Sequence, residues 1–372
     1  MKIGVIGAGV AGLSCALACR RRGHEVEVFE QAEALAEVGA GLQISPNGMA
    51  VLQDIGLTQD IQKCAQPIDY IHLSDGLTDR SVVRMGLDHL ARGYGAFHRA
   101  DLVQMIFDAC KSAGVGFHFA APHDGGMIDG FDLIVGADGL HSPVRAALNG
   151  PGEPLFTGHV AWRALVPAVG HTAAEARVAM GPGRHVVSYP LRGGRLINVV
   201  AIEERAQWAV ESWSAKGDPR QMRQVFAGFG PRTRALLAEV SQCYEWGLFR
   251  HPIAARWHDG RQVALIGDAA HPTLPFMAQG ANMALEDAWV LAQQVTMHDV
   301  TAGLVSYERL RRARVTRALA AAQANAMRYH LANPMLRKVA HVGLSVLGRA
   351  APGFLPSRFD WLYGHDVTQA HQ

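Results

Sequence analysis

Three acidic residues, Glu30, Asp138 and Asp268, each follow a short run of apolar residues. The three stretches are HEVEVFE, FDLIVGAD and VALIGD, and each is long enough for one strand of a sheet. On an open α/β sheet, ligands collect outside the carboxyl ends of the strands. A carboxylate at such an end accepts hydrogen bonds from sugar or polyol hydroxyl groups. The pattern therefore predicts a site at the sheet edge for a ligand with a sugar-like part.

The first of these acids closes a complete strand–turn–helix–strand unit. KIGVIG reads as a strand, Gly7, Gly9 and Gly12 have GxGxxG spacing, and LSCALACRRRG reads as a helix. Gly7 permits the tight turn, Gly9 lets the backbone approach a pyrophosphate, and Gly12 lets the helix pack closely. The same glycines disfavour a secretory leader, which the apolar N-terminus imitates. The unit predicts dinucleotide binding.

Composition excludes several classes of protein. The chain has 372 residues, 49% of them apolar and 18% charged, which is typical of a globular enzyme. The formal net charge of +2 gives no electrostatic reason to expect nucleic acid or an anionic membrane as a partner. The five cysteines are scattered and form no CxxC pattern, so we expect neither a disulfide framework nor a metal site. A cytoplasmic protein is the default expectation.

Five motifs occur in an order that identifies a family. They are GAGVAG with Glu30, GAGLQISPNGM (39–49), HRADL with Arg99, GADGLHSPVR (136–145) and GDAAHPTLPFMAQGANMALEDA (267–288). In these residues the chain resembles the group A FAD-dependent aromatic monooxygenases, over nearly its whole length. FDWLYGHDV and AWRALVP resemble the salicylate hydroxylase-like branch more loosely.

The resemblance implies FAD as cofactor, NADH or NADPH as a transient co-substrate without a domain of its own, and O2. FAD would be reduced by NAD(P)H and form a C4a-hydroperoxide that hydroxylates a small (hydroxy)aromatic substrate. The residues that the resemblance assigns to FAD are Gly7, Gly9, Ala11, Gly12, Glu30, Gln31, Leu42, Arg99, Asp138, Gly139, Asp268, Gly280, Ala281 and Asn282.

A hydroxyaromatic substrate needs a base within hydrogen-bond reach of its hydroxyl group. We expect His185 or Tyr189 in this catalytic role, with Pro275 in the loop that borders the reaction; Gln43, Arg163 and Phe276 would contact the substrate. Some members of the family carry a polar residue near Pro275 and Phe276, and others a histidine at Gln43. The substrate class therefore stays open between salicylate or hydroxybenzoate and hydroxypyridine. The alternative is a flavin-binding redox sensor, or another NAD(P)H–flavin oxidoreductase without hydroxylation.

The fold that positions these residues is predicted to be α/β. We expect a Rossmann-like FAD-binding domain of the para-hydroxybenzoate hydroxylase type, with an inserted, mainly antiparallel β substrate domain and C-terminal helices. The FAD-binding domain would comprise residues 1–68, 92–150 and 250–325. Residues 69–91 and 151–249 would form the substrate sheet, with a hairpin at 74–87, and 326–372 a C-terminal helical segment.

Four local features complete the expectations. A helix is predicted near 219–229, and another beginning near Gly280. The arginines between 309 and 317 are expected on a solvated helix face. The run VAHVGLSVLGRAAPGFL is too short and too interrupted to span a membrane, so we expect a packed helix, with peripheral docking left open. The stretch 120–131 should be a bare turn, so FAD would be held more loosely; the chain would be a monomer or a homodimer.

Overall fold

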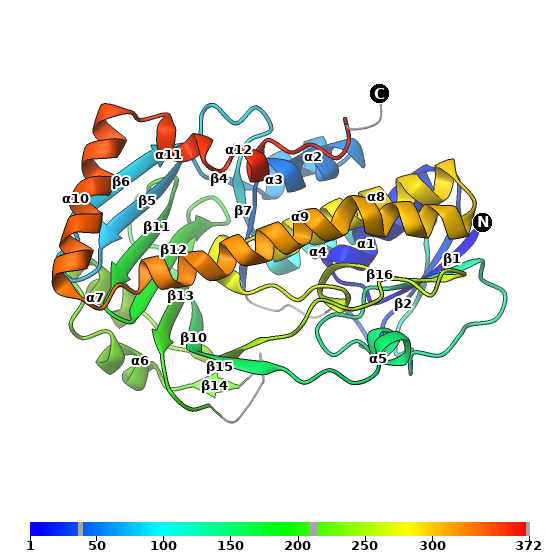
Figure 1. Cartoon of the computed structure of the whole chain (residues 1–372), viewed down its shortest axis with the longest axis horizontal. Coiled ribbons are helices and arrows are strands. Elements are labelled where there is room, and N and C mark those ends of the chain that lie inside the picture. The colour runs from blue at the N-terminus through cyan, green and yellow to red at the C-terminus, as the bar shows by residue number, and fades with distance from the viewer. Residues whose placement is uncertain (36–39, 171, 209–214, 370–372) are drawn as a thin grey trace.

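A computed structural model describes residues 1–35, 40–170, 172–208 and 215–369. Gly39, which opens the second motif, lies outside these residues. One layer is a five-stranded sheet (Figure 1) in the order β16 (Val263–Leu265), β9 (Leu133–Gly136), β1 (Lys2–Ile6), β2 (Glu25–Phe29) and β8 (Gly116–His118). All its pairings are parallel, so the carboxyl ends of its strands lie along one edge. The sheet is the predicted Rossmann-like core.

Helices cover this sheet because their apolar faces are buried against the apolar side chains of its strands. The helices of this part are α1 (Val10–Arg21), α4 (Arg99–Ser112), α5 (Pro143–Asn149) and α8 (Gly280–Met297). Nine of the twelve residues of α1 are buried, since α8 and α4 both pack against it. Two 3-10 turns, η1 (Gly267–Ala269) and η2 (Pro275–Met277), lie between β16 and α8. The helix predicted to begin near Gly280 is confirmed.

A second sheet of eight strands lies at the other end of the molecule (Figure 1). Its order is β14 (Lys216–Gly217), β15 (Cys243–Arg250), β10 (Leu155–Pro167), β13 (Leu196–Glu204), β12 (Arg184–Leu191), β11 (Glu175–Gly181), β5 (Tyr70–Asp75) and β6 (Ser81–Gly86). Every pairing is antiparallel except β11 with β5. The predicted antiparallel sheet and its hairpin are confirmed; the division into domains remains our proposal.

Shorter elements connect and cover the two sheets. A three-stranded sheet orders β3 (Gly41–Ile44), β7 (Gly95–His98) and β4 (Gln66–Pro67), with α2 (Pro46–Asp54) and α3 (Thr58–Cys64) nearby. The helix expected near 219–229 is α6 (Pro219–Val225), followed by α7 (Pro231–Ala238). Asp218 caps α6, because its carboxylate accepts from the backbone N–H of Arg220. Residues 119–132 contain no helix or strand, as expected for a bare turn.

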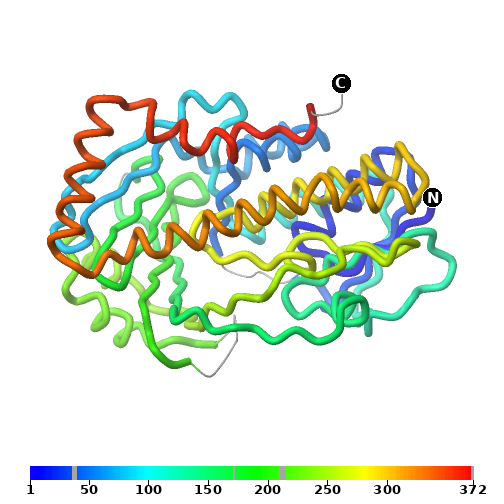
Figure 2. Tube along the Cα trace, in the orientation of Figure 1, coloured from blue at the N-terminus to red at the C-terminus, as the bar shows by residue number. Residues whose placement is uncertain are grey.

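The C-terminal part is helical, and the chain returns across the molecule (Figure 2). Its helices are α9 (Val300–Tyr329), α10 (Pro334–Ala350), α11 (Phe354–Ser357) and α12 (Asp360–Tyr363). Helix α10 packs against β6 with its inner side, yet none of its residues is fully buried. Its outer side exposes Met335, Val339, Val342 and Val346. The predicted packed helix is therefore packed on one side only.

The prediction of a solvated arginine face on α9 is wrong for two of its residues. Arg311 is 1% exposed, and its Nε donates to Oδ1 of Asp287 at 2.8 Å. Arg311 also pairs with Glu286, to which Arg314 donates at 2.7 Å. Arg311 lies on the side of α9 that faces α8, with the buried Tyr307 and Val315. The packing of α9 against α8 brings it to the carboxylates of Glu286 and Asp287. Arg309 and Arg317 are exposed, as expected.

Among the helices of the described residues, none combines the length and apolarity that crossing a membrane requires.

Candidate active site

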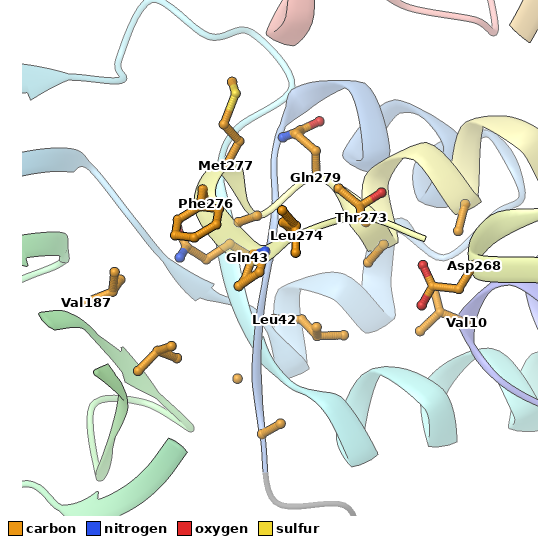
Figure 3. Close-up of a pocket in the computed structure, with 18 of the residues that line it drawn as sticks. Val10, Leu42, Gln43, Val187, Asp268, Thr273, Leu274, Phe276, Met277 and Gln279 are labelled. Atoms are coloured by element: carbon orange, nitrogen blue, oxygen red, sulfur yellow. The ribbon is translucent and has the colours of Figure 1, made fainter. Parts of the chain in front are cut away.

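One cavity of about 1020 Å³ joins the two sheets and the C-terminal helices. Of the residues that the sequence assigns to FAD, substrate or catalysis, all but Gly12 and Asn282 line it. Figure 3 shows Asp268 beside Val10 at one end, and Phe276, Leu274 and Gln43 between them and Val187. The fold thus brings together, around one space, residues as far apart in the sequence as Gly7 and Ala281.

The glycine motif forms the end of this cavity between β1 and α1. Gly7 has φ +103°, a conformation that L side chains rarely adopt, and a Cβ at Gly12 would lie 2.0 Å from the carbonyl oxygen of Gly7. Gly12 is therefore used for packing and does not face the cavity. Apart from its chain neighbours and the backbone of α1, a Cβ at Gly9 would meet no atom of the described residues within 4 Å, which leaves space there for a ligand. This space and the first N–H groups of α1 fit a pyrophosphate.

These two glycines give a matched pair of variants. Gly9→Val is expected to leave the fold intact and raise the Kd for FAD at least about tenfold, or about 1.4 kcal/mol, because the side chain fills the phosphate space. Gly12→Ala is expected to destabilise the protein itself, because its Cβ overlaps the Gly7 carbonyl. FAD titration and thermal unfolding separate the two effects. Wild-type FAD affinity in Gly9→Val would contradict the assignment.

The three acids lie at one sheet edge, as predicted, but in different surroundings. Glu30 accepts from the backbone N–H groups of Ala8 at 2.8 Å and Ala32 at 2.9 Å, which holds its carboxylate at the cavity wall. The Oδ2 of Asp138 accepts from Val144 N at 3.2 Å, whereas its buried Oδ1 has no partner among the described residues. Burial raises the pKa of Asp138.

Asp268 stands deep in the molecule with its side chain exposed to the cavity (Figure 3). The surrounding protein raises its pKa by desolvation, although nearby His271 and Arg99 lower it. An unpartnered Asp138 oxygen and an Asp268 carboxylate facing open space fit a ligand that supplies hydroxyl donors. These residues therefore fit the ribose and ribityl parts of FAD.

The beginning of α8 forms the next part of the wall. Its N-cap residue, Gln279, makes no side-chain capping hydrogen bond, so the first N–H groups of α8 remain available beside Gly280 and Ala281. The free N–H groups and the positive end of the helix dipole favour negative charge there, as on the pyrimidine side of a reduced flavin.

Asn282 differs from its two neighbours, because its side chain is turned away from the cavity. Its Oδ1 accepts from Ser45 N at 2.9 Å, and its Nδ2 donates to Gln43 O at 3.0 Å and to Ala278 O at 2.8 Å. The side chain therefore ties β3 and the start of α2 to the start of α8. A cofactor contact from Asn282 would have to come from its backbone.

The end of the cavity where the sequence predicts the substrate is bounded by β3, β10, β12 and η2. Gln43, Arg163, His185, Tyr189, Pro275 and Phe276 all line it. The Oε1 of Gln43 accepts from the hydroxyl of Tyr94 at 3.0 Å. Arg163 lies 5.2 Å from the ring centre of Trp246, and burial lowers its pKa to about 10. Burial also raises the pKa of Tyr189, so its phenol is protonated at neutral pH.

His185 lies against the ring of Phe276, with 6.0 Å between ring centres. Burial, with His330 and His159 nearby, lowers the pKa of His185 well below its usual value, so its imidazole is neutral at pH 7. A neutral imidazole at a cavity wall has a lone pair with which to accept a proton. The geometry therefore keeps His185 as the stronger candidate for the base.

Sequence reasoning missed two groups of residues around the cavity. His330 and Glu204 contact His185 or its partner, but they lie at the ends of α9 and β13 and belong to no motif. A second group is apolar and comes from β5, β6, β11, α10 and α11: Leu73, Val83, Met85, Val178, Met180, Leu344, Leu347 and Leu355. Alternating apolar positions in the strands were the available signal, but they did not show which side faces a cavity.

The parallel sheet, the glycine motif and the acids at the cavity wall together define a dinucleotide-binding flavoprotein fold. A family model described as "FAD binding domain" matches residues 131–322, and one described as "NAD(P)-binding Rossmann-like domain" matches residues 5–42. The 3-hydroxybenzoate 6-hydroxylase 1 of Aquipseudomonas alcaligenes is 32% identical, over 99% of this chain and 98% of the relative. The 3-amino-4-hydroxybenzoate 2-monooxygenase of Streptomyces cremeus is 37% identical, over 78% and 77%.

Among solved structures, a salicylate hydroxylase in complex with its substrate superposes with a TM-score of 0.81 at 23% identity, covering 99% of this chain and 96% of that one. This likeness supports the fold. The chain belongs to the FAD-dependent aromatic monooxygenases, in the salicylate hydroxylase-like branch.

Proposed function

We propose that this monooxygenase hydroxylates an aromatic ring that already carries a hydroxyl group, as in hydroxybenzoates or hydroxypyridines, with NADH or NADPH as electron donor. One observation carries the proposal: His185 and Tyr189 line the same cavity as the FAD-binding motifs. When bound, FAD would accept electrons from NAD(P)H and use them to activate O2. A hydroxyl group on the ring, once deprotonated, makes the ring electron-rich enough to accept oxygen.

We assign the side chains of this end of the cavity as follows. His185 accepts the proton of the substrate's hydroxyl group, and Tyr189 and Gln43 orient that group by hydrogen bonding. Arg163 supplies positive charge near the anion that results. Pro275 and Phe276 form a stiff apolar wall that would exclude water from this end of the cavity during the reaction. Arg99, exposed and lining the cavity, would contact the phosphate and ribityl side of FAD.

We further propose that the preferred substrate carries an apolar substituent. Eight apolar side chains from β5, β6, β11, α10 and α11 line the cavity. A carboxylate directed there would lose its hydration without gaining a paired charge from these eight side chains. An alkyl group would gain about 0.8 kcal/mol for each methylene that it buries.

Turnover of a panel of substrates tests both proposals. NAD(P)H oxidation is expected to rise on adding a hydroxyaromatic compound, with one hydroxylated product, and KM is expected to fall about fourfold for each added methylene of an alkyl substituent. Leu347→Arg should abolish this gain, whereas Val339→Arg, on the outer side of α10, should not. A KM that is independent of alkyl length would contradict the proposal of an apolar substituent. The absence of any hydroxylated product would contradict the proposed hydroxylase function.

The redox sensor without hydroxylation is not favoured, because the relatives are named as hydroxylases and monooxygenases. We keep three further expectations as proposals. The enzyme is cytoplasmic, and it acts as a monomer or homodimer. FAD is held loosely on the adenine side, since residues 119–132 form only a loop, from which Ala121 and His123 line the cavity. A Kd for FAD as low as that of a permanently retained flavin would contradict the last expectation.

A further inference from the structure

Two histidines and a glutamate connect the cavity wall to the molecular surface. His185 of β12 lines the cavity, and its Nδ1 lies 2.7 Å from Nε2 of His330, the residue that follows α9. Nδ1 of His330 lies 3.1 Å from Oε1 of Glu204, the last residue of β13. The side chain of His330 is 1% exposed, whereas that of Glu204 is 53% exposed. An unbroken path of hydrogen bonds therefore runs from the cavity to solvent.

The exposed carboxylate determines where the hydrogens of this path lie. A carboxylate only accepts, so Nδ1 of His330 must donate to Glu204. In a neutral His330, Nε2 is then unprotonated and accepts from Nδ1 of His185. The remaining nitrogen of His185, Nε2, then has a free lone pair. Glu204 thus imposes on His185 the tautomer that a base needs, through one intervening histidine.

The cavity also needs such a path, because His185 is poorly suited to keep a proton. Burial lowers the pKa of His185 well below its usual value and that of His330 to about 4. Two further charged or titratable groups face His330: His159 of β10, whose ring centre lies 5.3 Å away, and Arg184 of β12. Both disfavour a cation there. A proton accepted by His185 alone would return to the substrate, so it has to move on.

We propose that His330 and Glu204 form a proton relay that carries the proton of the substrate's hydroxyl group from His185 to solvent. The substrate O–H bond breaks, and its electron pair stays on the oxygen while an N–H bond forms at Nε2 of His185. The hydrogen on Nδ1 of His185 passes to Nε2 of His330, and the hydrogen on Nδ1 of His330 passes to Glu204 and then to water. No oxidation is involved. The relay rests on the proposed function, because it needs a hydroxyaromatic substrate.

Glu204→Gln tests the relay with little risk to the fold, because the residue is half exposed and glutamine can still accept from His330. We expect kcat for hydroxylation to fall about tenfold or more with the substrate KM unchanged. After a rapid rise in pH, the phenolate absorbance of bound substrate should also appear more slowly. Glu204→Asp should restore part of the rate, and so should added formate, which can take the proton at the surface. Glu239→Gln, an exposed glutamate of the same part of the chain, is the control.

All assays include a chelator, because ligand atoms of His159, Glu204 and His330 lie within 4.8 Å of one another and could bind a stray metal ion. Wild-type rates of turnover and of phenolate formation in Glu204→Gln would overturn the relay and leave the hydroxylase function standing. The relay would also be overturned if Glu204→Gln were slow, formate did not speed it up, and Glu204→Asp were as slow as Glu204→Gln. If the wild-type enzyme hydroxylates no hydroxyaromatic compound, the proposed function fails and the relay fails with it.

Discussion

Replacing Arg311 by methionine is expected to lower the free energy of unfolding by about 3–5 kcal/mol. Glu286 and Asp287 are both 0% exposed, and Arg311 pairs with each of them. Although burial acts to raise their pKa values, Arg311 helps to lower both, so both carboxylates are charged in the folded protein. Methionine fills the space of the arginine stem but leaves these charges without their central partner. Urea denaturation at a fixed FAD concentration measures the loss.

The matched control is Arg309→Met on the exposed side of the same helix, which should change stability by no more than about 0.5 kcal/mol. If Arg311→Met cost no more than the control, the two carboxylates would have to be protonated or hydrated in the folded state. Acid should lower the free energy of unfolding of the wild-type protein by protonating the carboxylates of Glu286 and Asp287. Because their folded pKa values are lowered, their contribution is present above the ordinary carboxyl pKa and is lost as pH falls below it.

Replacing His185 by phenylalanine is expected to lower kcat for hydroxylation by about 10²- to 10⁴-fold, the usual contribution of a general base. Phenylalanine keeps the ring volume beside Phe276 and removes both nitrogens, so FAD binding and the flavin absorption spectrum should not change. Stopped-flow measurement of NAD(P)H oxidation together with product analysis checks this. The effect should be smaller for substrates whose hydroxyl group is already ionised at the assay pH.

Two further variants make this result specific. His89→Phe replaces an exposed histidine that does not line the cavity, so turnover should match the wild type. Tyr189→Phe should mainly raise KM, because we assign Tyr189 to orientation. A large loss of kcat in Tyr189→Phe with near-normal turnover in His185→Phe would mean that Tyr189 is the base and that His185 is not.

The sequence by itself determined the cofactor end of this protein. Gly7, Gly9 and Gly12 are local in the chain, and their backbone conformation and spacing already require a tight turn and a close helix. Likewise, Glu30, Asp138 and Asp268 each follow their own strand, and parallel strands bring their carboxyl ends to one edge whatever the rest of the fold. Local rules were therefore sufficient to predict the fold class and the position of these six residues at one sheet edge; their roles toward FAD remain our proposal.

Only the tertiary structure decided the roles of residues whose partners are distant. Arg311 is expected in solvent because it is charged, but it lies on the same side of α9 as Tyr307 and Val315, where α8 packs and supplies two acids. Asn282 belongs to a cofactor motif, yet its side chain holds β3 and the start of α2 in place. His330 and Glu204 reach His185 from the ends of α9 and β13. These contacts depend on how separate elements pack, and no spacing along one chain segment encodes that packing.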